Sequence, residues 1–484
     1  MKKIVLTTYL LLALFTWKAT AQTAIQAKEN AVPLSLQEAV DIALKNNIQV
    51  KQSELQIKNA QLTFQQAKNN QLPTVSGSVN ESFNFGRSLD PFTNSFASKN
   101  INYNSLGVNS NVMIFNGYVL KNTIAQNDLL LKASEFDLQA MKESISLQVV
   151  LAYLNILNAE DQLSIAQSQT AITKLQIERT DKLVKAGSLP QSNVFDLKAQ
   201  LASEETTVIN NESTLALAKL SLLQLMNDTT ISDVSLTRIS VPIPSKESYD
   251  VSLNSIFQTA EGSQPLVKAS DIRIKSAEKS IDIAKAGFLP TLSGFASWGA
   301  NQSNAQKKYV IDGTTSTYLG TVNFNGQDYP LNVQQAKAVE AGTVGYFDQL
   351  SNSSNYSFGL NASIPIFTRY NNRTRVAQAK VQKLNAEFEA QKTRQTLRQN
   401  IETAYTNMNN AAKRYDALTV QVSALEESYR AAESRFNAGA IDYVSYSLQK
   451  TNLDKAKANL AQAKYDYVFR TKILDYYQNK PLVF

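Results

Sequence analysis

The side chains that could do chemistry in this chain are carboxylates and hydroxyls, because the sequence holds no His and no Cys. Thiolate chemistry, disulfides and lipidation of a Cys are therefore excluded, and the commonest general base and metal ligand is missing. No HExxH, GxSxG or P-loop pattern accompanies the 41 acidic residues. The composition argues against an enzyme and predicts no cofactor and no metal site.

The charge balance also bears on partners. The chain has 48 basic and 41 acidic residues, a formal net charge of +7. The basic residues are spread along predicted helices and form no dense block, which indicates solvated helix faces. We therefore expect no nucleic-acid partner.

The first residues have the pattern of an export signal. Lys2 and Lys3 precede a mostly apolar run over 4–17, and Ala19-Thr20-Ala21 is a small-x-small cleavage site. The pattern predicts a signal peptide over 1–21. A membrane anchor helix is the weaker alternative, because a span needs roughly 20 apolar residues. No later stretch is apolar enough to span as a helix, so we expect any membrane part to consist of strands.

Three segments of the chain occur twice, which predicts an internal duplication. The matching pairs are AKNNQLPTVSG (67–77) with AKAGFLPTLSG (284–294), GVNSNVMI (107–114) with GLNASIPI (359–366), and KAG (185–187) with NAG (437–439). The last two pairs share one offset of 252 residues. One architecture built from two repeats, 22–250 and 251–484, is therefore expected.

Caps and breakers predict the elements of each repeat. Ser35 and Glu38 form a capping box, and Leu-Pro pairs end both early helical blocks. The first repeat is expected to hold helices over 35–71, strands over about 73–115, a long helix over 119–186, a helix over 191–226 and a connector over 227–250. The second is expected to hold helices over 251–287, strands over about 290–299 and 355–367, a long helix over 371–437 and a helix over 441–477. The Asn-, Ser-, Gly- and Thr-rich stretch 301–354 receives no assigned element.

The strand segments alternate between apolar and polar residues, so each has one face of either kind. Asn109 and Asn111 lie on the polar face in the first repeat, and Asn361 and Ser363 in the second. Such alternation suits tilted strands with lipid outside and water inside, and also a soluble sandwich. Four strands per chain are too few to close a barrel, and open edges are forbidden in hydrocarbon. Pooling of strands between several copies, with these four side chains facing the lumen, is the favoured interpretation.

The long helices carry heptads of apolar residues on both sides of a short turn. In the first repeat the seven-residue spacing runs through Val194, Leu201, Val208, Leu215 and Leu222. This pattern predicts antiparallel coiled-coil hairpins, each with a long helix on the order of 100 Å. A soluble coiled-coil spacer would explain the heptads, although not the strands.

Both predicted hairpins turn at a glycine, Gly187 or Gly439, as a helix end with positive φ requires. Leu189 and Ile441 place an apolar side chain just after each turn. Exposed apolar residues at the tip of a rod favour docking onto the helices of another protein. Closing the end of the hairpin is the alternative.

Taken together, these features resemble the TolC-like outer-membrane efflux factors over essentially the whole mature chain. The features are the export signal, the duplication, the LPTVSG and LPTLSG starts of the strand blocks, the Ile364–Phe367 ending and the glycine tips. Arg435 begins the family's Arg-aromatic-x-x-Gly pattern at the second tip, whereas the first tip keeps only its glycine.

The resemblance implies an α+β membrane protein and a homotrimer. Four strands per chain would contribute to a shared transmembrane β-barrel in outer-membrane lipid, and the hairpins to a periplasmic α-barrel. The implied partners are a periplasmic adaptor (membrane fusion protein) and an inner-membrane transporter of RND or ABC type. Residues implied to dock the adaptor are Lys185, Gly187, Leu189, Arg435, Gly439 and Ile441.

One departure concerns the closed periplasmic mouth. Many relatives place acidic residues six and nine positions after each tip glycine. Here the first tip has Asn193 and Asp196, and the second has Ser445 and Leu448, with Asp442 off the pattern. An acidic ring is in doubt, and Asn193, Asp196, Asp442 and Ser445 are the gate candidates. A solvated carboxylate at a helix start is the alternative for Asp196.

The resemblance therefore implies a passive outer-membrane exit duct for efflux or type I secretion, exporting drugs, other small molecules or proteins. A structural or adhesive coiled-coil protein of the envelope, without channel activity, is the alternative. An outer-membrane hydrolase is the poorest hypothesis, because no paired catalytic spacing supports it.

Overall fold

A computed structural model describes residues 32–89, 94, 96–97, 100–228, 230–238 and 251–480. The predicted signal peptide and most of the predicted connector lie outside these residues. The described chain divides into two compact units. The helical unit comprises residues 32–60, 131–274 and 386–480, and the sheet unit comprises 61–130 and 275–385. Each is described by itself.

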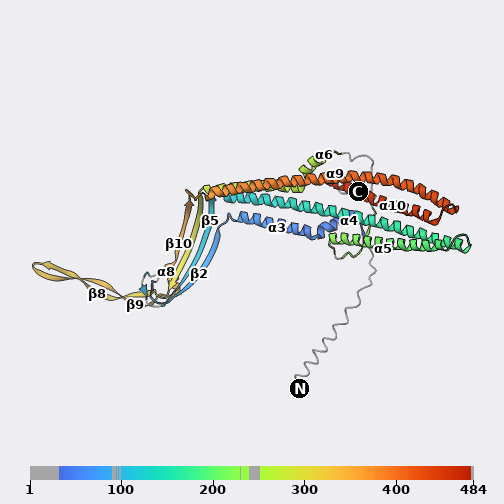
Figure 1. Ribbon diagram of the computed structural model, residues 1–484. Helices are drawn as coiled ribbons and strands as arrows, with labels where there is room; N and C mark the ends of the chain where they lie inside the picture. The colour runs from blue at the N-terminus through green and yellow to red at the C-terminus, as the bar shows by residue number, and fades with distance from the viewer. Residues whose placement is uncertain are drawn as a thin grey trace, which may run out of the picture. The chain divides into compact units, whose positions relative to one another are not determined.

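Four helices form the two hairpins (Figure 1). Each hairpin pairs a helix of 67 residues with one of 35. The first consists of α4 (Val119–Lys185) and α5 (Ser192–Met226), and the second of α9 (Asn371–Asn437) and α10 (Tyr443–Tyr477). The equal lengths in the two repeats are the structural counterpart of the duplicated sequence.

Shorter helices precede each set of strands. They are α2 (Leu36–Asn46), α3 (Ile48–Asn69), α6 (Leu253–Ser263) and α7 (Pro265–Lys285), the last followed by the 3₁₀ turn η1 (Ala286–Phe288). The Ser35 hydroxyl accepts a hydrogen bond from the Glu38 amide, and the Glu38 carboxylate accepts one from the Ser35 amide, so the capping box is formed. Asn47 and Gln264 interrupt the two helical blocks at equivalent places.

The helical unit has two large apolar clusters, each built mainly from one repeat. In the first, Tyr153 is fully buried, and its hydroxyl donates to the backbone oxygens of Leu34 at 3.1 Å and Thr237 at 2.6 Å. This clamp joins two short strands, β1 (Val32–Leu34) and β6 (Val234–Leu236), which pair in parallel. β6 lies inside the predicted connector, where the sequence predicted no strand. In the second repeat, Ile401, Met408 and Leu474 form the core with residues of α6.

The sheet unit contains a four-stranded antiparallel sheet in the order β10-β7-β5-β2. Its strands are β2 (Thr74–Asn84), β5 (Ile101–Asn116), β7 (Thr291–Ser303) and β10 (Asn355–Ser363). Two strands thus come from each repeat, and β10 and β2 are the edges.

The sheet unit differs from the prediction in two places. β10 ends at Ser363 rather than near 367, since Pro365 has no N–H for a ladder bond. The stretch 301–354 is structured: β8 (Lys307–Phe324) and β9 (Gln327–Thr343) form a hairpin, followed by α8 (Tyr346–Ser353). Asn325 and Gly326, both with positive φ, make its turn, an Asn-Gly signal that the composition of the stretch obscured. A further short pair joins β3 (Ser88–Leu89) and β4 (Phe96–Ala97).

Candidate functional site

The two hairpin tips have the same backbone geometry. Gly187 has φ +75° and Gly439 has φ +72°. The Gly187 amide donates to Val184 at 2.9 Å and the next amide to Leu183 at 2.9 Å, and the second tip repeats both bonds. This is the Schellman end of a helix, which needs a residue that tolerates the left-handed region. No atom lies within 4 Å of a Cβ added at either glycine, so backbone conformation alone demands glycine there.

The side chains around the tips divide into exposed and packed groups. Lys185 and Arg435 are exposed, and Lys185 pairs with Asp181 one turn earlier at 2.5 Å. Leu189 is half-buried. Ile441 is also half-buried, because it packs against a cluster that includes Tyr443 and Tyr446. Ile441 therefore helps to close its hairpin, as the alternative interpretation requires, and a docking role for the tip residues stays a prediction.

The gate candidates lie at the starts of α5 and α10. Asp442 is the N-cap of α10, and its Oδ1 accepts a hydrogen bond from the Ser445 amide at 2.7 Å. This bond holds the pKa of the Asp442 carboxyl below its ordinary value. The structure therefore brings Asp442 and Ser445 together in a capping role. Asp196 is exposed and Asn193 half-buried near the start of α5, and a gating role for these two residues stays a prediction.

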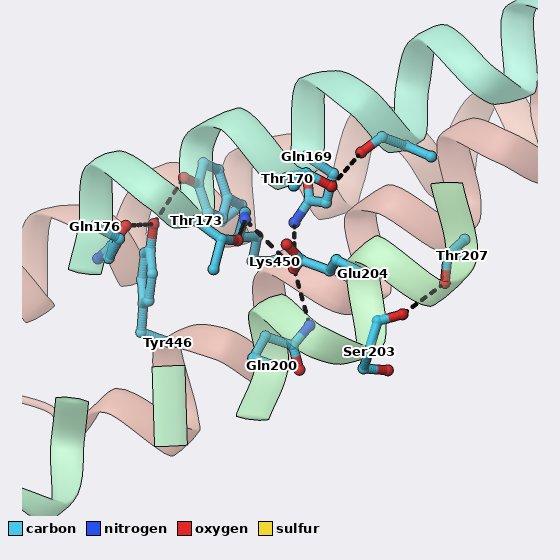
Figure 2. A network of polar contacts seen from close by, with 12 residues as sticks. Gln169, Thr170, Thr173, Gln176, Gln200, Ser203, Glu204, Thr207, Tyr446 and Lys450 are labelled. Atoms are coloured by element: carbon cyan, nitrogen blue, oxygen red, sulfur yellow. Dashed lines mark hydrogen bonds and ion pairs between the residues drawn. The ribbon is translucent and has the colours of Figure 1, made fainter. Parts of the chain in front are cut away.

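An aromatic cluster joins the two hairpins behind the tips. The rings of Phe436 and Tyr446 stack with centroids 4.9 Å apart, and Leu197 of α5 packs against Tyr446. The Tyr446 hydroxyl lies 2.9 Å from that of Tyr429 and donates to Gln176 Oε1 at 3.2 Å (Figure 2). Burial, above all, raises the pKa of Tyr446, so this phenol stays neutral.

A buried ion pair follows deeper in the same region (Figure 2). Lys450 Nζ donates to Thr173 Oγ1 at 2.8 Å and lies 3.8 Å from Glu204 Oε1. Glu204 Oε1 also accepts from the amides of Gln200 at 2.9 Å and Gln169 at 3.4 Å. Burial lowers the pKa of Lys450. The three segments α4, α5 and α10 thus meet at one polar contact.

The sequence interpretation missed Lys450 and Glu204, although a signal was present. Lys450 falls between Tyr446 and Leu453 on the apolar stripe of α10, and Glu204 lies one heptad after Leu197. A charged residue at a core heptad position usually has a specific partner. The heptad pattern could therefore have identified both residues, although not their pairing.

The predicted lumen residues share one face of the sheet. Asn109 on β5 pairs with Ser297 on β7, which pairs in turn with Ser357 on β10. The hydroxyls of Ser297 and Ser357 are 2.7 Å apart. Asn111, Asn361 and Ser363 lie on this same face by alternation. A bulge between Met113 and Phe115 shifts the register of β5 against β7 only beyond Asn111.

The opposite face of the sheet is apolar and exposed. Phe358, Tyr356 and Val79 are 87%, 78% and 74% exposed. An apolar patch of this kind marks contact with another protein or with lipid. Among the residues that the structure describes, no helix is long and apolar enough to cross a membrane. Within the same residues no group of three or more acidic side chains could hold a metal ion.

The fold thus defines a class of chain built from two repeats. Each repeat contributes two strands to one shared sheet and also forms one long helical hairpin. The chain belongs to the outer membrane efflux protein family, whose sequence model matches residues 39–228 and 256–471. Membership places it in the outer membrane, in a family of efflux channels.

Individual relatives are distant in sequence. The outer membrane protein TolC of Escherichia coli is 23% identical over 334 residues, 68% of this chain and 60% of TolC. The chain thus spans less than two thirds of the length of that relative. The outer membrane efflux protein BepC of Brucella suis is 20% identical over 435 residues, 88% of this chain and 81% of BepC.

Solved structures show the same fold. The Campylobacter jejuni CmeC outer membrane channel aligns with a TM-score of 0.69 at 19% identity, covering 92% of this chain and 87% of CmeC. The Vibrio cholerae outer membrane protein VceC aligns with a TM-score of 0.69 at 15% identity, covering 93% and 97%. The α+β fold with its paired hairpins is therefore that of a TolC-type channel subunit.

Proposed function

We propose that three copies of this chain form a passive exit duct that carries drugs, other small molecules or proteins across the outer membrane. The observation that carries the proposal is the sheet: one face is mostly polar, the other is apolar and exposed, and both edge strands lack a neighbour within the described chain. Edges cannot stay open in hydrocarbon, so the strands of three chains would have to pair with one another. The polar face, with Asn109, Asn111, Asn361 and Ser363, would then line the bore.

Adjacent residues of β10 give a matched test of this orientation. Phe358→Arg places a charge on the apolar face, which should cost about 2–4 kcal/mol at the bilayer midplane. Ser357→Arg places the same charge on the polar face, where it should be tolerated. We expect Ser357→Arg to reach the outer membrane and alter single-channel conductance in planar bilayers, and Phe358→Arg to fail to assemble. Equal assembly of both variants, or a wild-type trimer that inserts without conducting, would contradict the duct.

We further propose that the hairpin tips dock a periplasmic adaptor, which joins the duct to an inner-membrane transporter of RND or ABC type. Gly439→Val would force a β-branched residue into the left-handed region and distort the tip. Ala440→Val adds the same side chain one residue later, without positive φ. We expect Gly439→Val to reduce tolerance of exported drugs in a strain that relies on this duct, with Ala440→Val close to wild type. Equal tolerance in the two strains would argue against docking at this tip.

A further inference from the structure

A cavity of about 310 Å³ lies between α4, α5 and α10, next to the buried ion pair. Gln162, Gln169, Gln200, Glu204 and Asp454 are among the polar residues that line it. Its volume is that of a pocket for a small organic molecule, and far exceeds that of a bare metal ion. The sequence patterns gave no indication of it.

Two carboxylates present unsatisfied oxygens in this region. Glu204 Oε2 and Asp454 Oδ2 are buried and have no hydrogen-bond donor among the described residues. Glu204 is 8% exposed, so water reaches it poorly. Buried carboxylate oxygens almost always have a partner, and the exceptions call for a reason. A bound donor would supply one.

The side-chain amides around the cavity already donate to other acceptors. The Gln169 and Gln200 amides both donate to Glu204 Oε1, and not to the unsatisfied Oε2 (Figure 2). The Gln162 amide donates to the backbone oxygen of Ala458 at 2.6 Å, and the Asn211 amide to that of Gln162 at 3.2 Å. Glu204 Oε2 and Asp454 Oδ2 are thus left without a donor from these amides, which favours a ligand that donates.

The local charge is also unbalanced. Lys450 is the buried cation beside two carboxylates, and its ammonium group lies on the Oε1 side of Glu204. Lys455 lines the cavity but is exposed, and Lys457 pairs with Glu426 of α9 at 2.9 Å. Buried negative charge in excess over positive charge attracts a cation.

The lining distinguishes an organic cation from a metal ion. Ca²⁺ takes six to eight oxygen ligands, whereas this cavity has two carboxylates. Ile165, Ala166 and Ala458 add an apolar wall that would suit an alkyl chain. We propose that the cavity binds a small organic cation with a primary ammonium group, whose N–H groups donate to Glu204 Oε2 and Asp454 Oδ2.

Calorimetric titration of the full-length chain in detergent tests the site, with n-propylammonium chloride as the probe and 1-propanol and MgCl₂ as controls. We expect saturable binding of propylammonium alone at a pH of about 8. Burial raises the pKa of Asp454 to about 6, so binding should weaken as the pH falls below that value. Binding of the alcohol with equal affinity, binding of Mg²⁺ alone, or no saturable heat would overturn the proposal.

Variants localise the binding. Asp454→Asn and Glu204→Gln should each weaken the affinity at least about tenfold, because each removes a charge-assisted hydrogen bond. Glu427→Gln makes the same change at an exposed carboxylate of α9 that pairs with Arg430, and should bind like wild type. Circular dichroism checks that each variant is folded. If Glu204→Gln does not fold, Asp454→Asn and the pH profile of wild type still decide, and unchanged affinity in Asp454→Asn refutes the site. The test is independent of conduction, so it can fail while the duct stands.

Discussion

Replacing Lys450 by Met should destabilise the helical unit by about 3 kcal/mol. The side chains of Lys450 and Glu204 are each only 9% exposed, so neither charge is well solvated. The substitution keeps the volume of the side chain but removes its ammonium group. Glu204 would then stay buried with two neutral amide donors as its remaining partners. The cost belongs at the lower end of the range for breaking a buried pair, because those amides persist.

A second lysine on the same helix provides the control. Lys457 lies 2.9 Å from Glu426, closer than the 3.8 Å between Lys450 and Glu204, but its pair is 42% and 46% exposed. Water screens exposed pairs, so Lys457→Met should cost about 1 kcal/mol or less. The double variant Lys450→Met with Glu204→Met removes both buried charges together. It should recover to within about 1 kcal/mol of wild type, since apolar replacement of a whole buried pair is often neutral.

Equilibrium unfolding in guanidinium chloride, followed by far-ultraviolet circular dichroism on the detergent-solubilised chain, measures these differences. The expected order of stability is wild type, Lys457→Met, then Lys450→Met, with the double variant well above the Lys450 single variant. A Lys450→Met chain within about 0.5 kcal/mol of wild type would refute the burial argument, because that is the range of ordinary surface substitutions. A larger loss for Lys457→Met would refute it as well.

Three further predictions concern the helical unit. Burial raises the pKa of Asp454 to about 6, so the folded state binds the proton of this carboxyl more tightly than the unfolded chain does. The contribution of Asp454 to stability therefore falls as the pH rises from about 4 to 6. After allowance for solvent screening, Asp454→Asn should therefore be about 1–2 kcal/mol more stable than wild type above pH 6, and should differ much less near pH 4. Thermal melts across that pH range measure the difference. Tyr446→Phe removes the hydroxyl contact with Tyr429 and should lower stability by about 1–2 kcal/mol in the same unfolding assay; an unchanged midpoint would contradict the network. Arg394→Lys loses the planar group that bonds two carboxylates of α6 and α7, and should cost about 1 kcal/mol and speed amide exchange in those helices, whereas unchanged exchange would argue against it.

Local patterns identified much of the architecture. The capping box at Ser35 and the left-handed glycines at both tips are properties of a few neighbouring residues, so their structure follows from short-range chemistry. The alternation that separates Ser357 from Phe358 is equally local. The β8–β9 hairpin was missed because its polar composition hid the Asn-Gly turn.

What the sequence determined by itself is the duplicated plan: two long hairpins, glycine tips, and strands with one polar face. Only the tertiary structure decided the strand order β10-β7-β5-β2, the clamp of Tyr153 on β1 and β6, and the meeting of Lys450 with Glu204 beside the cavity. The reason is physical. Periodicity reports which face of an element is buried, whereas partners far apart in the chain are chosen by packing and by the need to satisfy each buried charge.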